Sequence, residues 1–174
     1  MGCIQRRLKM FRRVDLPAQV PGRLLLHSMP GRFEAIDKVW QQVKSDAVGA
    51  IVCLTEEFEI RLKSSKYADA LETGTVPCSV VPFEIREGGV PADREAFWAL
   101  ANDLADRLRS GEALLIHCAG GVGRTAMLAV SVLLALGNRS TKRKARCRGQ
   151  GRSSKPCHRS TCFPGALRRW RLSN

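Results

Sequence analysis

Residues 112–136, EALLIHCAGGVGRTAMLAVSVLLAL, carry two apolar runs separated by a short glycine-rich turn. The first run, 112–117, is short and continuous, as expected of a strand that is buried on both faces of a sheet. The second run, 125–136, is apolar on every side, which predicts a helix buried within the domain. A strand that turns directly into a helix is the repeating unit of an α/β fold.

The sequence before this unit repeats the same alternation of strands and helices. Short apolar runs predict strands, and apolar residues at helical spacing predict helices. Strands are expected at 22–28, 48–55 and 78–85, and helices at 32–46, 56–72 and 92–111. This order predicts an α/β domain with a mostly parallel sheet flanked by helices on both faces. In such sheets ligands bind beyond the carboxyl ends of the strands, which is where the glycine-rich turn lies.

Two residues mark the ends of the helix at 92–111, and two cysteines are assigned to the core. Asp93 is placed to cap the first turn of this helix, and Gly111 is placed to end it. Cys53 lies in the apolar run AIVCL, and Cys78 lies in PCSVV. Both are expected to be small core residues.

The length and composition suit one globular domain. The chain has 174 residues, and no apolar run reaches the ~20 residues that span a bilayer. The basic start MGCIQRRLKMFRR has no long apolar segment after it, so a secretory signal is not expected. Myristoylation of Gly2 is not expected either, because Arg6 stands where Ser or Thr is required. The odd count of 7 cysteines favours reduced thiols in a cytoplasm over a disulfide scaffold.

The net charge of +13 is concentrated in the last part of the sequence. Residues 138–174 hold 12 of the 29 Lys and Arg residues and no Asp or Glu, which leaves 17 basic and 16 acidic residues before them. The basic balance is therefore no argument for a nucleic-acid-binding domain. Three parts are expected: a basic N-terminal segment (1–19), a catalytic domain (20–137) and a basic tail without periodicity (138–174).

The glycine-rich turn combines a nucleophile with an anion site. Small residues after Cys118 let successive backbone N–H groups point inward, and such a nest beside a helix N-terminus binds anions. The five loop residues are Ala119, Gly120, Gly121, Val122 and Gly123. Arg124 follows with a planar fork that matches two phosphate oxygens. The positive electrostatic field of these amides and of Arg124 favours the thiolate form of Cys118.

The sequence HCAGGVGRT, residues 117–125, resembles the signature of the cysteine-dependent protein tyrosine and dual-specificity phosphatases. The resemblance covers about residues 20–137 and implies a phosphotyrosine phosphatase-like fold. It implies that Cys118 attacks phosphorus to form a phosphocysteine and that Arg124 binds the phosphate oxygens. Thr125 would stabilise the departing thiolate, and His117 would orient the loop. No cofactor or metal is implied.

The same resemblance points to a general acid upstream of the cysteine. Compact dual-specificity members often carry Asp, any residue, Gly-Val-Pro at this place, and here residues 87–91 read EGGVP. Glu87, 31 residues before Cys118, is the candidate acid, and Asp93 is the second choice. Glu in place of Asp adds a methylene, and Ala126 stands where the family usually has Gly. Both are departures from the pattern.

The expected activity is the hydrolysis of phosphotyrosine in proteins, with phosphoserine and phosphothreonine left open. The loop between Cys118 and Arg124 carries no charge, which favours phosphorylated proteins over polyanionic lipids, and no membrane partner is expected. Two alternatives remain: a rhodanese-like sulfurtransferase, and a phosphate-binding protein without turnover whose basic tail contacts nucleic acid. The oligomeric state is left open.

Three interpretations of the tail, 138–174, also remain. A basic arm could neutralise the phosphates of nucleic acid, with Trp170 stacking on a base. A metal site could be formed by the tail residues Cys147, Cys157, His158 and Cys162, although their spacing lacks a C-x2-C knuckle. The favoured interpretation is a shifted reading frame in a GC-rich gene, because the tail lacks acidic residues and apolar periodicity. It predicts acidic and apolar helix-forming sequence in the neighbouring frame after the codon for Gly137.

Overall fold

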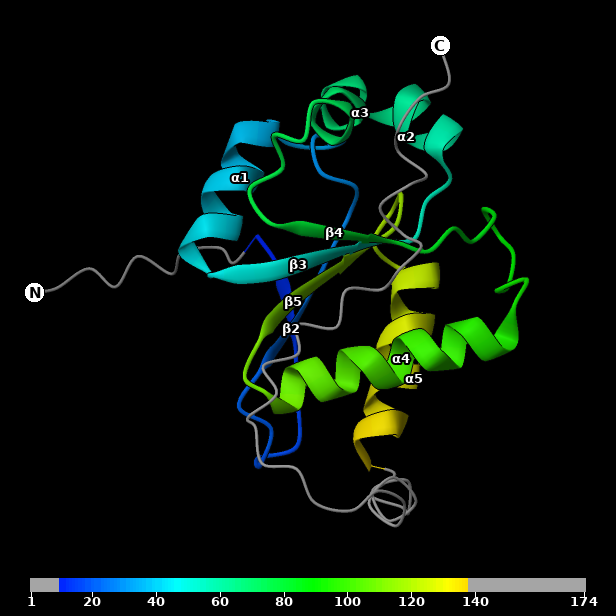
Figure 1. Ribbon diagram of the computed structural model, residues 1–174. Coiled ribbons are helices and arrows are strands. Elements are labelled where there is room, and N and C mark those ends of the chain that lie inside the picture. The colour runs from blue at the N-terminus through cyan, green and yellow to red at the C-terminus, as the bar shows by residue number, and fades with distance from the viewer. Residues whose placement is uncertain (1–9, 138–174) are drawn as a thin grey trace, which may run out of the picture.

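The structure is a computed structural model that describes residues 10–137. One sheet has the strand order β1-β2-β5-β3-β4, in which β1 is antiparallel to β2 and the other neighbours are parallel (Figure 1). The strands are β1 (Arg12–Val14), β2 (Arg23–His27), β3 (Val48–Cys53), β4 (Ser79–Pro82) and β5 (Ala113–His117). The helices are α1 (Ile36–Ser45), α2 (Glu57–Lys63), α3 (Ser65–Glu72), α4 (Arg94–Arg109) and α5 (Gly123–Gly137). The predicted α/β fold with a mostly parallel sheet is confirmed.

Helices cover both faces of the sheet. Helices α4 and α5 lie on one face, and α1 and α3 lie on the other (Figure 1). Side chains of the central strand β5 alternate between the two layers, as the pleat of a strand requires. Leu114 and Ile116 pack with α4 and α5, whereas Leu115 packs with α1. Every residue of β5 is therefore buried, as its continuous apolar run predicts.

Three parallel strands end side by side at one edge of the sheet. His117, at the end of β5, is paired with His27 on β2 and with Cys53 on β3. The segments that follow these strands therefore start from the same edge. Cys118 is the first residue after β5, so the fold places it where the loops converge.

The predicted ends of α4 are confirmed. Asp93 is the N-cap, and its carboxylate accepts a hydrogen bond of 2.9 Å from the backbone N–H of Ala96. Gly111 follows the C-cap with a φ of 94°, a left-handed conformation that favours glycine. Cys53 is fully buried as predicted. Cys78, beside the edge strand β4, is half-buried and packs against the core cluster of β3, β5 and α1, so its core assignment holds only in part.

The prediction of one helix at 56–72 is wrong. The segment forms two helices, α2 and α3, which are separated at Ser64. The backbone of Ser64 is not helical (φ −158°, ψ 83°), and its buried hydroxyl donates a hydrogen bond of 2.8 Å to the carbonyl oxygen of Pro30. A tertiary contact to a distant loop thus breaks the helix, and helix periodicity carries no signal for such a contact.

Helix α5 is buried on one side only, which corrects the expectation of a helix buried all round. Leu128 and Val132 are fully buried against the sheet and α4, whereas Val130 is 55% exposed and Leu134 is 53% exposed. Within residues 10–137, no element covers this outer side. None of the described helices combines the length and the apolar character that a membrane span requires.

Candidate active site

Cys118 lies at the bottom of the loop between β5 and α5. Its side chain is 3% exposed, and the backbone N–H of Gly121 donates a hydrogen bond of 3.2 Å to its sulfur. Helix α5 begins at Gly123, so the sulfur faces backbone amides at the N-terminus of a long helix. This is the predicted arrangement of a thiol within an anion-binding turn.

The loop holds the pKa of Cys118 below its usual value. Burial raises this pKa, but the nearby Thr125 hydroxyl and the amides of Thr125, Gly121 and Val122 lower it by more. The Thr125 hydroxyl is buried and has no hydrogen-bond partner within residues 10–137. This hydroxyl is therefore free to donate a hydrogen bond to the Cys118 sulfur. A lowered pKa means that more of the thiol is ionised at neutral pH, and the thiolate is the nucleophilic form.

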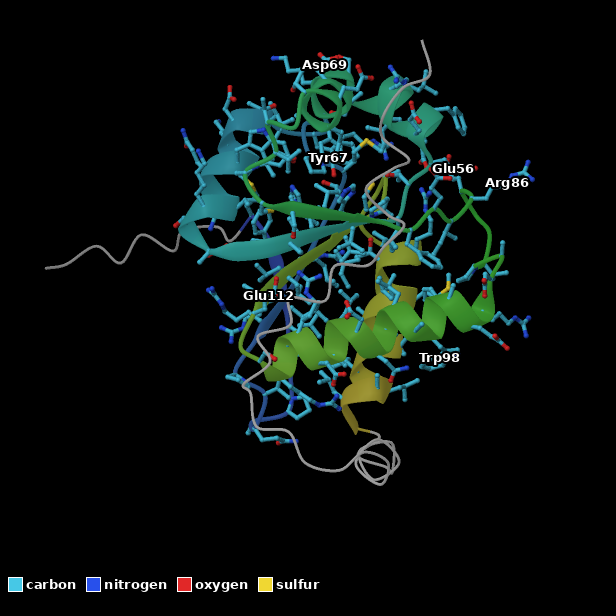
Figure 2. The ribbon with its side chains drawn as sticks, viewed as in Figure 1. Glu56, Tyr67, Asp69, Arg86, Trp98 and Glu112 are labelled. Atoms are coloured by element: carbon cyan, nitrogen blue, oxygen red, sulfur yellow. The ribbon has the colours of Figure 1, made fainter. Side chains whose placement is uncertain are left out.

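His117 is held in its neutral form beneath the loop. Its Nδ1 lies 3.4 Å from the carbonyl oxygen of Cys118, and its Nε2 lies 3.0 Å from the hydroxyl oxygen of Tyr67. Tyr67 lies between α3 and the sheet (Figure 2). Burial lowers the pKa of His117 to about 3, and burial holds the pKa of Tyr67 well above its usual value. The hydroxyl of Tyr67 therefore donates to Nε2, and Nδ1–H faces the Cys118 carbonyl.

Arg124 is anchored by a carboxylate that the sequence did not single out. Its Nη1 donates to Glu59 Oε2 and to the carbonyl oxygen of Ile85, both at 2.8 Å. Its Nη2 donates to Glu59 Oε1 at 2.9 Å. These bonds leave the N–H of Nε and one N–H of Nη2, which point to the same side of the guanidinium. The free edge is the pair of donors that fits two phosphate oxygens.

Glu59 is 2% exposed and lies on α2. Burial raises its pKa, but hydrogen bonds and charges from Arg124 and Lys63 outweigh the burial, so the pKa of Glu59 lies below its usual value. The pair therefore stays ionised at neutral pH. No spacing rule identifies Glu59, because the segment EEFE at 56–59 offers three carboxylates.

Glu87 is connected to this pair through Lys63. The ammonium of Lys63 lies 2.7 Å from Glu59 Oε1 and 3.0 Å from Glu87 Oε2. Glu87 itself is 67% exposed, on the loop that follows β4. Arg86, next to it, points away from the domain at this edge (Figure 2). The second-choice acid, Asp93, is committed to capping α4, so the geometry favours Glu87.

A residue of the predicted N-terminal segment also contacts the loop. Residues 12–14 form β1 in the sheet, and Arg12 Nη2 donates a hydrogen bond to the carbonyl oxygen of Gly121. Gly121 has a φ of 70°, and a Cβ there would collide with the carbonyl oxygen of His27. The loop is thus pinned between the end of β2 and the side chain of Arg12.

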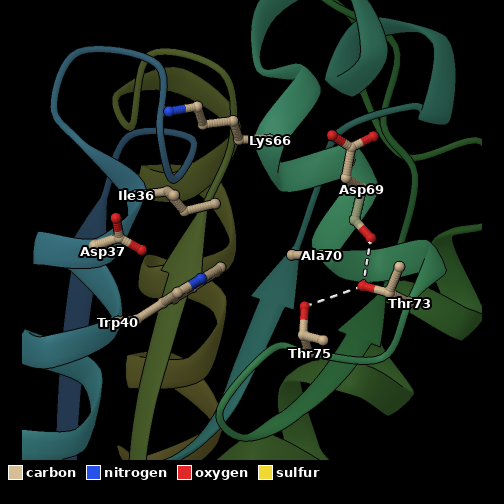
Figure 3. A pocket seen from close by; sticks show the side chains of 8 residues that line it. All are labelled: Ile36, Asp37, Trp40, Lys66, Asp69, Ala70, Thr73 and Thr75. Atoms are coloured by element: carbon tan, nitrogen blue, oxygen red, sulfur yellow. Dashed lines mark hydrogen bonds between the residues drawn. The ribbon is translucent and has the colours of Figure 1, made fainter.

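A separate hollow of about 390 Å³ lies between α1 and α3 (Figure 3). Its lining includes Trp40, Lys66 and Asp69. Thr73, which also lines it, donates a hydrogen bond of 2.7 Å from its hydroxyl to the carbonyl oxygen of Asp69. None of the predicted site residues lines it. The part of the chain that the structure describes has no cluster of three or more His, Cys, Asp or Glu residues with metal-binding geometry. The metal site considered for the tail lies outside the described residues.

Comparisons with known proteins identify the family. The family model described as "Polymorphic toxin system, DSP-PTPase phosphatase" matches residues 27–138. The cyclin-dependent kinase inhibitor 3 of Rattus norvegicus is 36% identical over 61 residues, which are 35% of this chain and 28% of that protein. This chain thus matches less than a third of that relative's length.

Among solved structures, the fold resembles kinase associated phosphatase (KAP) with its catalytic-site cysteine replaced by serine. The TM-score is 0.63 at 22% identity, covering 75% of this chain and 76% of that chain. A structure of Tk-PTP in its active form gives a TM-score of 0.49 at 25% identity, covering 67% of this chain and 76% of that chain. The match to the family model covers more than half of the sequence and includes the whole cysteine loop. The chain therefore belongs to the DSP-PTPase phosphatases of polymorphic toxin systems.

Proposed function

We propose that this protein hydrolyses phosphate monoesters of proteins through a phosphocysteine. The observation that carries the proposal is the position of the Cys118 sulfur. It lies within hydrogen-bonding distance of the Gly121 amide, with its pKa below the usual value, beside an arginine that keeps two donors free. A nucleophile and a cradle for three phosphate oxygens thus share one turn.

In the first step, the Cys118 thiolate attacks phosphorus and the bond from phosphorus to the leaving oxygen breaks. The leaving oxygen takes a proton from Glu87, because an alkoxide or phenoxide is a poor leaving group. Glu87 is ion-paired with Lys63 in the structure, so the loop after β4 has to carry Glu87 toward the leaving group. The free edge of Arg124 and the loop amides hold the charge on the phosphoryl oxygens.

In the second step, water attacks the phosphorus of the phosphocysteine and the sulfur–phosphorus bond breaks. Glu87 takes a proton from the water, and Cys118 leaves as a thiolate. The Thr125 hydroxyl is buried with no competing partner in the described part of the chain, so it stabilises that thiolate. His117 stays neutral throughout and orients the loop through the Cys118 carbonyl.

The substrate is a phosphorylated protein, with phosphotyrosine as the expected residue and phosphoserine and phosphothreonine as further substrates. The protein that resembles this fold at 22% identity is described as a kinase associated phosphatase. Cys53, Cys78 and Cys118 are free thiols, and the mechanism needs a reduced Cys118. We therefore propose a reducing compartment, the cytoplasm, as the place of action.

The test compares the wild-type protein with Cys118→Ser and Glu87→Ala on p-nitrophenyl phosphate in the presence of EDTA. Cys118→Ser abolishes turnover, Glu87→Ala reduces it in part, and the chelator has no effect. Turnover that survives Cys118→Ser contradicts the phosphocysteine mechanism. A sulfurtransferase is not favoured, because Arg124 and Thr125 have no task in that chemistry, and turnover of thiosulfate by the wild-type protein would reveal one.

A further inference from the structure

The loop that carries Glu87 is fixed at two points on the ion pair of Arg124 and Glu59. The carbonyl oxygen of Ile85 accepts a hydrogen bond of 2.8 Å from Arg124 Nη1. Two residues later, the carboxylate of Glu87 accepts hydrogen bonds of 3.0 and 3.1 Å from the ammonium of Lys63. That ammonium also donates to Glu59 Oε1 at 2.7 Å. The loop thus contacts the guanidinium directly at one residue and through two side chains at the other.

The two contacts differ in how firmly they are built. Ile85 is 1% exposed and belongs to the core, so the first contact is fixed by packing. Glu87 is exposed and lies in a tight turn, in which the N–H of Gly89 donates a hydrogen bond of 2.9 Å to the carbonyl oxygen of Arg86. Within residues 10–137, the ion pair with Lys63 is the one that holds Glu87. Lys63 therefore determines where the carboxylate of this exposed turn lies.

Lys63 is itself fixed on the opposite side by Glu59. The two residues are four positions apart on α2, which is the spacing at which helix side chains meet. Lys63 is 20% exposed and Glu59 is 2% exposed, so this contact is largely removed from water. Hydrogen bonds to Glu59 and Glu87 hold the pKa of Lys63 above its usual value, so its ammonium is charged at neutral pH. Glu87 can therefore turn to another group while Lys63 stays in place.

Lys63 lies on the side of Arg124 that is left free for phosphate. Glu59 Oε2 accepts from Nη1 of the guanidinium, and Glu59 Oε1 accepts from Nη2. Lys63 contacts Oε1, and Nη2 is one of the two nitrogens of the free edge. Hydrogen bonding to Glu59 raises the pKa of Arg124, and the charge of Glu87 adds to this rise. Glu87 is thus within electrostatic reach of the phosphate-binding guanidinium.

We propose, resting on the phosphatase function above, that Lys63 is a positioning residue that keeps the general acid Glu87 beside the phosphate site. A bound ester brings negative charge next to Glu87, and a like charge favours the protonated form of a carboxyl group. The protonated Glu87 loses its ionic attraction to Lys63 and gives its proton to the leaving oxygen. The ionised Glu87 then pairs with Lys63 again and stays beside the phosphocysteine, where the second step needs it as a base.

The same contacts allow a different role, in which Lys63 supports Arg124 through Glu59. The two roles differ in their kinetics. A residue that acts through Glu87 changes proton transfer, so its loss lowers kcat most on esters with a strongly basic leaving group. A residue that acts through Arg124 changes phosphate binding, so its loss affects every ester and raises the inhibition constant of inorganic phosphate.

The experiment measures kcat on phenyl phosphate and on p-nitrophenyl phosphate, and the inhibition constant of inorganic phosphate. The variants are Lys63→Gln and Lys63→Arg. The matched control is Arg61→Gln, because Arg61 lies on the same helix and also pairs with two carboxylates, those of Glu57 and Glu72.

An ion pair with an exposed partner is worth up to about 1 kcal/mol, so Lys63→Gln should lower kcat on phenyl phosphate by about fivefold. The loss on p-nitrophenyl phosphate should be smaller, and the inhibition constant of phosphate should stay at its wild-type value. Lys63→Arg keeps the charge and should restore the rate on phenyl phosphate. Arg61→Gln should change none of the three quantities.

A double variant tests whether Lys63 acts through Glu87. When Glu87 is already replaced by Gln, Lys63→Gln should cost nothing further, because no carboxylate is left to position. The proposal is overturned by an equal loss on the two esters, by a higher inhibition constant of phosphate, or by the same loss in the Glu87→Gln background.

Proteolysis separates this proposal from the phosphatase function. Arg86 precedes Glu87 and points away from the domain, so trypsin can cut after it (Figure 2). Full-length Lys63→Gln should be cut there several-fold faster than the wild-type protein and Arg61→Gln, as measured by mass spectrometry of the fragments. If hydrolysis depends on Cys118 but Lys63→Gln keeps the wild-type ratio of the two esters, the positioning role alone is refuted. If no phosphate ester is hydrolysed, faster cleavage of Lys63→Gln alone still supports its hold on the turn, and equal cleavage of the three proteins refutes it.

Discussion

Arg124 and Glu59, 65 positions apart in the sequence, are joined by two hydrogen bonds of 2.8 and 2.9 Å. Their side chains are 7% and 2% exposed, so the pair is almost fully removed from water. Removing one partner of a buried ion pair leaves the other charge uncompensated, which costs far more than the pair itself gains. The carboxylate therefore determines both where the guanidinium lies and which of its edges stays free.

We predict that Glu59→Gln lowers kcat/KM for p-nitrophenyl phosphate at least tenfold, because Arg124 loses the charge that aligns it. Glu59→Ala should in addition lower the free energy of unfolding by about 3 kcal/mol. Steady-state kinetics and urea unfolding measure the two effects. The matched control is Glu57→Gln on the same helix, whose partner Arg61 is exposed. Equal effects of the two Gln variants would show that Glu59 has no special task.

The lowered pKa of Cys118 predicts that this thiol is alkylated by iodoacetamide at a lower pH than an ordinary cysteine. A thiol reacts as its thiolate, so the pH at half-maximal rate reports the pKa. Thr125→Val should move this midpoint upward, since it removes the hydroxyl that contributes to the lowered pKa and keeps the backbone amide. A midpoint at the usual ~8.5 in the wild-type protein contradicts the thiolate cradle. Cys118→Ser identifies the signal, because it removes the Cys118 thiol and leaves the other six cysteines in place.

Periodicity was sufficient to predict the four parallel strands and the position of the cysteine loop. The runs that became β3 and β5 are continuous and apolar because both faces of these strands are covered, and that pattern is local in the sequence. His117, Cys118, Arg124 and Thr125 are consecutive or nearly so, and local geometry alone brings them together. Their catalytic roles remain predictions that the experiments above test.

The missed residues depend on contacts that no local pattern contains. Glu59 was not found because the segment EEFE at 56–59 offers three carboxylates, and no local pattern tells which of them faces Arg124. Arg12 was not found because β1 has three residues, two of them basic, and shows no apolar alternation. In both cases a charged side chain reaches a loop that is distant in sequence.

The neutral state of His117 predicts a pH dependence of stability. Its folded pKa of about 3 lies below the usual 6.5, so below pH 6.5 the unfolded chain binds a proton that the folded chain does not. Stability from this group is therefore present above about pH 6.5 and is lost as the pH falls toward 3. From pH 6.5 to pH 5, this loss is on the order of 1–2 kcal/mol.

Replacing His117 by Asn, which keeps an N–H near the Cys118 carbonyl, should remove that part of the acid sensitivity. The measurement is the free energy of urea unfolding at the two pH values for both proteins. Asn cannot be protonated, so the variant should lose less stability than the wild-type protein over this interval. An identical loss in the two proteins would mean that His117 takes up its proton in the folded state as well.

The assignment of Glu87 as general acid predicts how kcat depends on the leaving group of the substrate. A general acid matters most where the leaving oxygen is strongly basic, as in phenyl phosphate, and least for p-nitrophenyl phosphate. Glu87→Gln should therefore reduce kcat by about a hundredfold on phenyl phosphate and by much less on p-nitrophenyl phosphate. The control is Glu84→Gln, an exposed carboxylate on the same loop. Equal losses on the two esters would leave Glu87 without the role of proton donor.

The hydrogen bond from Arg12 to the carbonyl of Gly121 predicts that the first strand supports phosphate binding. Arg12→Ala should raise KM for p-nitrophenyl phosphate several-fold, because the loop amides are held less firmly around the phosphate. Arg12 is exposed, so the free energy of unfolding should change by no more than about 1 kcal/mol. The control is Arg13→Ala, since neighbouring residues of a strand point to opposite faces. If both variants raise KM equally, the effect comes from the loss of positive charge and not from the hydrogen bond to Gly121. If neither variant raises KM, the loop keeps its shape without Arg12.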